Sequence, residues 1–93
     1  MASPIAELLA TEAVVGKLGE RGISIDEARQ VPRNPHVIVR NPRAADTARR
    51  LLIGRTDGGR TLTLVIEPTI DPTTWLIVTG WEAAAGERKL LIG

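Results

Sequence analysis

An apolar pattern around a glycine-rich turn, residues 51–68, constrains the fold of this chain more than any other stretch. Its middle, Asp57-Gly58-Gly59, is typical of tight hairpin turns, because these residues readily adopt positive φ angles. A two-residue loop at Gly58-Gly59 would pair Ile53 with Leu64, and a loop at Asp57-Gly58 would shift the pairs by two residues and keep the same faces together. A simple three-residue loop would put the apolar residues of the two arms on opposite faces. We therefore expect a two-residue loop.

Two helices are expected before the hairpin. Apolar residues recur at helical spacing over residues 4–18, and Ser3-Pro4 is a typical N-cap followed by a typical first helical residue. Ser24 and Glu27 match a capping box at the start of a short second helix, which Pro32 ends. The residues of this second helix that we expect in the core are Ala28 and Val31.

Strands follow the second helix. Residues 36–40 form a first strand, and a second strand opens at Thr47 or Arg49 and becomes the first arm of the hairpin. Residues 75–79 form a fourth strand, and residues 82–91 form a final helix. This order predicts a single α+β domain over residues 1–93, in which two N-terminal helices pack on an antiparallel four-stranded sheet that is followed by a C-terminal helix.

The composition argues against several classes of protein. The chain of 93 residues is 43% hydrophobic, which suffices for one small core, but it has no cysteine and a single histidine. We therefore expect no disulfide, no metal site and no cofactor. The run from Gly54 to Arg60 lacks the lysine of a Walker A motif. The sequence shows no signal peptide and no apolar run long enough to cross a membrane, so we expect a cytoplasmic protein.

Positive charge is concentrated in the middle of the chain. Residues 32–60 hold seven arginines and two aspartates, a net charge of +5, although the whole chain carries only +1. Such a local excess favours a patch that binds a polyanion, while arginines that blunt exposed strand edges would give the same count. Guanidinium groups bind phosphate oxygens through paired hydrogen bonds and stay protonated, so they suit RNA and phosphoryl chemistry.

A metal-independent ribonuclease needs few groups beyond cations around the phosphate. One group must help the 2′-hydroxyl to attack, and another must protonate the leaving oxygen. Arg55, Arg60 and Arg88 could supply the cations, and Asp57 or Glu87 could act as the base or orient an arginine. Solvated turn and helix faces are the alternative interpretation of these five residues.

Several segments resemble the BrnT toxins, which are RelE-like ribonucleases of type II toxin–antitoxin pairs. The run GRTDGGR at residues 54–60, with the later pair Glu87-Arg88, is the most specific part of the resemblance. The other matching segments are residues 17–28, Asn34-Pro35 and residues 77–79. The resemblance implies a RelE-like toxin domain, cleavage of RNA, and neutralisation by a cognate antitoxin of the ribbon-helix-helix type in a toxin–antitoxin hetero-oligomer.

The resemblance also gives the candidate residues their roles. Arg55 and Arg60 would hold the phosphate, with Asp57 orienting them. Glu87 and Arg88 would provide proton transfer and charge stabilisation from the terminal helix. Further candidate contacts to RNA are Arg21, Arg40, Arg43, Arg49, Arg50 and Trp81.

The chain departs from the family pattern at several positions. Gly80-Trp81 stand where the family has Ala-Arg, and Ala84 replaces a threonine that caps the terminal helix. The family opens with a short strand, whereas residues 3–12 look helical here. Trp81 could stack on an unpaired base or fill the space between sheet and helix. The alternative function is therefore a non-catalytic interaction module of the same fold that binds an acidic partner or RNA.

Overall fold

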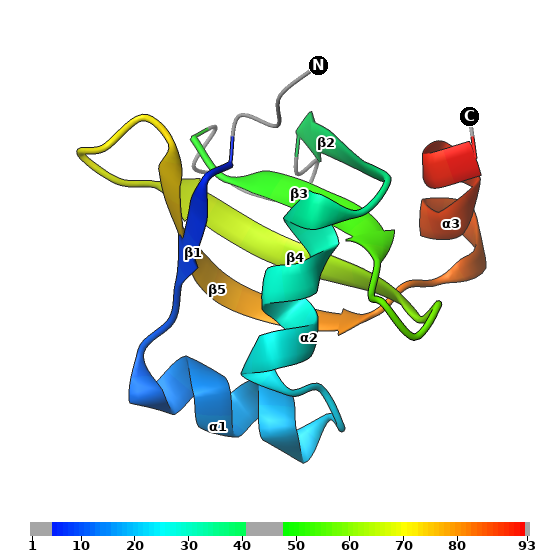
Figure 1. Cartoon of the computed structure of the whole chain (residues 1–93), viewed down its shortest axis with the longest axis horizontal. Coiled ribbons are helices and arrows are strands. Elements are labelled where there is room, and N and C mark those ends of the chain that lie inside the picture. Colours follow the sequence, from blue (N-terminus) through cyan, green and yellow to red (C-terminus); the bar gives the residue numbers. More distant parts are fainter. Residues whose placement is uncertain (1–4, 41–47, 93) are drawn as a thin grey trace.

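The computed structural model describes residues 5–40 and 48–92, which form a five-stranded mixed sheet with three α-helices and one 3-10 helix (Figure 1). The elements follow in the order β1 (Glu7–Leu9), α1 (Glu12–Glu20), α2 (Ile25–Gln30), η1 (Val31–Arg33), β2 (His36–Arg40), β3 (Arg50–Arg55), β4 (Thr61–Pro68), β5 (Thr74–Glu82) and α3 (Ala85–Ile92). The α+β class and the C-terminal helix are confirmed. No helix in these described ranges is long and apolar enough to cross a membrane.

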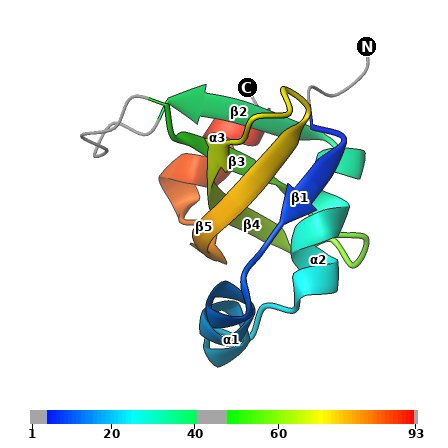
Figure 2. The ribbon, with the colours of Figure 1, turned by 90° about the vertical axis from the view of Figure 1, so that its left-hand side faces the viewer.

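The sheet has the strand order β1-β5-β4-β3-β2. Strands β2 to β5 pair antiparallel with their neighbours in sequence, as predicted. The prediction of a four-stranded antiparallel sheet is wrong by one strand, because β1 adds to the far edge and runs parallel to β5 (Figure 2). The sheet is therefore mixed, and the N-terminal part of the described chain lies at the edge opposite β2.

Strand β1 takes the place of the first half of the helix predicted over residues 4–18. Thr11 has an extended backbone and its hydroxyl accepts the N–H of Val14 at 3.2 Å, so Thr11 is the N-cap and α1 begins at Glu12. Upstream, Leu8 pairs with Trp75 and is buried. The apolar spacing fits a helix as well as a strand, and pairing with β5 decides between them. The predicted cap Ser3-Pro4 lies outside the described residues.

The second helix agrees with its sequence signals. The Ser24 hydroxyl accepts the N–H of Glu27 at 3.0 Å, and the Glu27 carboxylate accepts the N–H of Ser24 at 3.1 Å, which completes the predicted capping box. Both residues that were expected in the core, Ala28 and Val31, are fully buried. These contacts are local in sequence, which explains why the pattern predicted them.

The hairpin turn differs from the prediction. Thr56 and Arg60 pair through the Thr56 N–H and the Arg60 carbonyl at 2.8 Å, so the loop is Asp57-Gly58-Gly59. Gly59 has a φ of 88°, which makes this a three-residue loop that ends on a left-handed glycine. The two-residue loops, and with them the pairing of Ile53 with Leu64, are wrong: Ile53 lies opposite Thr63.

The shifted register is tolerated because both faces of the sheet are covered. The first face carries Leu52 and Leu64 and packs against α1, α2 and η1, whereas the second face carries Leu51 and Val65 and packs against Leu91 of α3. A one-residue shift exchanges the two faces of a strand, and it exposes apolar residues only when one face meets solvent. Here neither face of the β3–β4 hairpin does.

The boundary between the last strand and α3 also lies later than predicted. Trp81 and Glu82 continue β5, opposite Thr63 and Leu62, and α3 begins at Ala85 instead of at residue 82. The N–H of Ala83 donates to the carbonyl of Thr61 at 3.0 Å and extends the pairing by one residue. The side chain of Trp81 therefore lies on the second face of the sheet.

Gly54 shows how closely η1 and β2 approach the hairpin. A Cβ at Gly54 would lie 2.7 Å from the His36 Cβ and 2.8 Å from the Val31 Cγ1, whereas a Cβ at Gly16 in α1 would meet nothing within 4 Å. Gly54→Ala should lower the free energy of unfolding by about 2 kcal/mol. Gly16→Ala should raise it by about 0.5–1 kcal/mol, because alanine loses less backbone entropy in a helix.

Urea unfolding followed by circular dichroism measures both variants. Equal stabilities for Gly54→Ala and Gly16→Ala would contradict the close packing of η1 and β2 against β3.

Candidate functional site

Arg55 is the last residue of β3 and lies on the second face of the sheet, in line with Leu51 and Ile53. Its side chain is exposed, and its backbone carbonyl accepts the Nδ2 of Asn34 at 2.9 Å. Within the described residues, no hydrogen bond or ion pair joins the Arg55 guanidinium to another group. The backbone position is thus fixed, while the cation remains available to a ligand.

Asp57 lies in the hairpin loop and faces the opposite way, toward α2. Its carboxylate accepts the Nδ2 of Asn34 at 3.0 Å, and its N–H donates to the Oε1 of Gln30 at 2.9 Å. Asn34 and Gln30 therefore fasten the loop to the segment around η1. In the described structure Asp57 makes no bond to Arg55 or Arg60. It is therefore not placed to orient these arginines, which is the role expected for it from the sequence.

Arg60 bridges the start of β4 to the helical layer on the first face. Its Nε donates to Glu82 at 3.0 Å, and its Nη1 donates to the Gly22 carbonyl at 2.7 Å and to the Oε2 of Glu27 at 3.2 Å. The carboxylates of Glu82 and Glu27 raise the pKa of Arg60. This guanidinium is occupied by groups of the domain itself.

Glu87 occupies the centre of a polar cluster between α3 and the second face. Its Oε1 accepts the backbone N–H of Ala84 at 2.8 Å, the hydroxyl of Thr63 at 3.0 Å and the indole N–H of Trp81 at 3.0 Å. The bond to Ala84 caps α3, which has no threonine for that purpose. The Oε2 atom has a single described contact, to the Trp81 indole at 3.3 Å, and is the less occupied oxygen.

The five candidate catalytic residues divide between the two faces. Arg55 and Glu87 lie toward the second face: Arg55 pairs with Thr61, two residues along β4 from the Thr63 that contacts Glu87. Arg60 and Asp57 point toward the first face and the segment around η1. Arg88 is exposed on α3 and donates to the Ala83 carbonyl at 3.3 Å.

The candidate RNA contacts also lie in different places. Arg40 of β2 and Arg50 of β3 lie opposite each other in the strand register, at the ends of these strands far from the hairpin turn. Arg49 forms an ion pair with Glu67 at 3.2 Å. Arg21 donates to the Thr79 hydroxyl and the Gly80 carbonyl at the edge of β5. Arg43 lies outside the described residues. Trp81 shares the second face with Arg55 and Glu87, and Arg49 continues the same alternation at the far end of that face.

Sequence reasoning missed Asn34, Gln30 and Thr63. The first two position the hairpin loop, and Thr63 is completely buried although its hydroxyl faces Glu87. The only available signal was Asn34-Pro35, which belonged to the BrnT resemblance and had no physical role attached. Thr63 carries no local signal, because its contact with Glu87 depends on the sheet register.

Comparison with known proteins gives one family. A family model described as a domain of unknown function, DUF4258, matches residues 11–81, which span α1 to the Trp81 position of β5. No curated protein and no solved structure gives a significant match.

The Arg60 bridge generates a pH-dependent prediction. The N–H of Ser24, together with Arg60, lowers the pKa of Glu27 below its ordinary value of 4.5. A carboxyl group whose pKa is lower in the folded state stabilises the fold at higher pH and loses that effect as the pH falls through the folded pKa. Glu27→Gln keeps the cap but removes the charge, so it should flatten the loss of stability below about pH 4.5.

Urea unfolding at pH 7 and pH 3 measures this difference. At pH 7 the variant should lose up to about 1 kcal/mol, since the ion pair is partly exposed. Glu20→Gln, at the exposed end of α1, is the matched control and should follow the unchanged protein. A Glu27→Gln profile that runs parallel to the unchanged protein would contradict the bridge.

Proposed function

The chain belongs to the family described as a domain of unknown function (DUF4258), and we propose that it is the toxin of a type II toxin–antitoxin system, of the BrnT type among the RelE-like ribonucleases. The GRTDGGR run and the Glu87-Arg88 pair support this proposal, and so does the short opening strand β1, which the resembling family also has. The observation that carries it is Arg55, an exposed guanidinium without a partner in the described structure, on the same face as Trp81 and Glu87.

The reaction that these residues suit is an attack within the RNA strand. The 2′-oxygen forms a bond to the adjacent phosphorus, and the bond from phosphorus to the 5′-oxygen breaks. Arg55 binds the non-bridging oxygens, whose negative charge increases in the transition state. The Oε2 of Glu87 takes the proton from the 2′-hydroxyl, and the resulting carboxyl group donates it to the leaving 5′-oxygen. Arg88 adds positive charge from α3, and no metal ion takes part.

The remaining candidate residues would support this site from a distance. Arg60 and Asp57 fix the two sides of the hairpin from which Arg55 extends. Trp81 is half-buried, and the exposed part of its indole ring would contact a base. The arginines at the far end of β2 and β3 would contact the RNA backbone without reading its sequence.

A second candidate, a non-catalytic interaction module, has one observation in its favour. The side chains of four of the five candidate catalytic residues already make hydrogen bonds inside the domain, and Arg55 is the exception. Trp81, which stands where the resembling family has an arginine, is itself a donor to Glu87. In this alternative, the exposed arginines bind an acidic partner or RNA and no bond is cleaved.

The toxin proposal implies a partner protein, and the interaction module implies an acidic partner or RNA. For the toxin, this is a cognate antitoxin, for which the resemblance suggests the ribbon-helix-helix type, assembled with the toxin in a hetero-oligomer. Cleavage of cellular RNA also implies that the protein acts in the cytoplasm.

Arg55→Ala tests the toxin proposal. Removing one preorganised donor from a transition state typically lowers the rate at least about 100-fold, so the variant should lose cleavage of labelled RNA in the presence of a chelator and should relieve growth arrest in cells that express the chain alone. Lys17→Ala, on the exposed surface of α1, is the matched control and should cleave normally. Circular dichroism checks that both variants fold.

Three results would separate the candidates. Chelator-resistant cleavage by the unchanged protein that Arg55→Ala abolishes supports the toxin. Cleavage that is identical in Arg55→Ala contradicts the role of Arg55. No cleavage, together with tight binding to the product of the neighbouring gene, favours the interaction module.

A further inference from the structure

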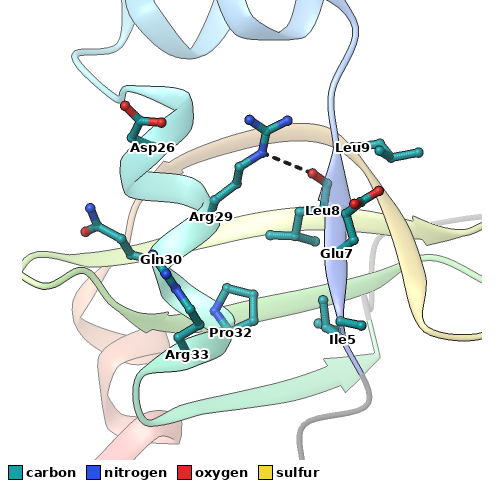
Figure 3. A pocket seen from close by; sticks show the side chains of 10 residues that line it. Ile5, Glu7, Leu8, Leu9, Asp26, Arg29, Gln30, Pro32 and Arg33 are labelled. Atoms are coloured by element: carbon teal, nitrogen blue, oxygen red, sulfur yellow. Dashed lines mark hydrogen bonds between the residues drawn. The ribbon is translucent and has the colours of Figure 1, made fainter.

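A groove runs between β1 and the α2–η1 segment, at the edge of the sheet (Figure 3). Its volume is about 770 Å³. Leu8 points from β1 toward the helix, and Leu8 and Ile5 are nearly completely buried, so with Pro32 they give the groove an apolar floor. The proposed RNA chemistry uses no residue of this groove.

Arg29 crosses the groove from α2. Its Nε donates to the Leu8 carbonyl at 3.2 Å, which fixes the plane of the guanidinium (Figure 3). Within the described residues the two terminal nitrogens have no hydrogen-bond or ion-pair partner. A guanidinium anchored through Nε presents these two nitrogens as a fork, which is the geometry that binds a carboxylate through two parallel hydrogen bonds.

Neither acidic residue of the groove forms a described ion pair with Arg29. Asp26 lies in the first turn of α2, one helical turn before Arg29, and Glu7 is an exposed residue of β1, whose buried side chain is Leu8 (Figure 3). No described salt bridge includes Arg29. A second cation, Arg33, lines the end of the groove formed by η1.

The dimensions fit a short peptide better than an isolated anion. One wall consists of five consecutive residues, 5–9, and the other runs from Asp26 to Arg33. At about 3.3 Å per extended residue, the strand wall is about 16 Å long, enough for four or five residues of a second extended chain. An apolar floor with a single oriented cation suits a peptide that places one aliphatic side chain and one carboxylate on the same side.

We propose that this groove binds an extended peptide segment of a partner protein that presents an aspartate or glutamate side chain to Arg29. The carboxylate accepts hydrogen bonds from the two terminal nitrogens of Arg29, and a neighbouring aliphatic side chain packs on Ile5, Leu8 and Pro32. This site lies toward the first face and the β1 edge, and none of its lining residues belongs to the proposed catalytic set. It therefore stands whether or not the protein cleaves RNA.

The test starts from a displayed library of random hexapeptides selected on the full chain. Enriched peptides should share an aspartate or glutamate next to an aliphatic residue. A synthetic peptide of the enriched sequence, labelled with a fluorophore, should bind Arg29→Gln at least tenfold more weakly than the unchanged protein in an anisotropy titration. Arg29→Lys should also bind weakly, because lysine keeps the charge but lacks the fork. Lys17→Gln, on α1, should bind normally.

Amide chemical-shift mapping locates the bound peptide. Shifts at residues 5–9 and 26–33 support the proposal, and replacing the acidic residue of the peptide with its amide should remove them. The proposal is overturned if the enriched peptides lack a carboxylate, if nothing is enriched, or if the shifts map to another surface. An oligoribonucleotide that shifts residues 5–9 and 26–33 when no peptide does so would also overturn it.

Discussion

Burial of both faces of the β3–β4 hairpin is the constraint on which the rest of the fold depends. Leu52 and Leu64 are completely buried on one face, and Leu51 and Val65 are buried on the other. Each face needs its own cover, because apolar area left in water would cost about 25 cal/mol per Å². The helical layer of α1, α2 and η1 covers the first face, and α3 contributes to the cover of the second, which is why helices precede and follow the strands.

The two covers are joined to the sheet by charged residues that look catalytic in the sequence. Arg60 links β4 to Glu27 of α2, and Glu87 links α3 to Thr63 and Trp81. These residues hold the helices against the sheet, so most of their hydrogen-bonding groups are engaged within the domain. Arg55 and Arg29 differ. Arg55 is held through its backbone carbonyl, which accepts the Nδ2 of Asn34, and Arg29 is held through its Nε, which donates to the Leu8 carbonyl, so both leave terminal guanidinium nitrogens for a ligand. This distinction separates Arg55 and Arg29 from Arg60, whose guanidinium is held by Glu27, Glu82 and the Gly22 carbonyl.

Local signals in the sequence predicted the structure better than signals that depend on pairing. The capping box of Ser24 and Glu27 and the antiparallel order of β2 to β5 follow from neighbouring residues and short connections. The strand β1 could not be distinguished from a helix, because its partner in β5 lies far along the chain. The predicted hairpin register is wrong because strand parity determines the register only when one side of the sheet faces solvent. In a sheet with two apolar faces, the residues of the turn determine the register of the hairpin.

The candidate site was predictable to a similar extent. The placement of Arg55 in line with Leu51 and Ile53 follows from strand alternation and does not depend on the loop length. The contact between Glu87 and Thr63 depends on the register, which the sequence did not determine. In the proposed function, RNA binds the second face at Arg55. The most direct test is amide and indole chemical-shift mapping with a short RNA whose 2′-hydroxyls are methylated, so that it binds without cleavage. We expect shifts at Arg55, Thr61 and the Trp81 indole, whereas shifts confined to Arg40, Arg49 and Arg50 would contradict RNA binding at Arg55.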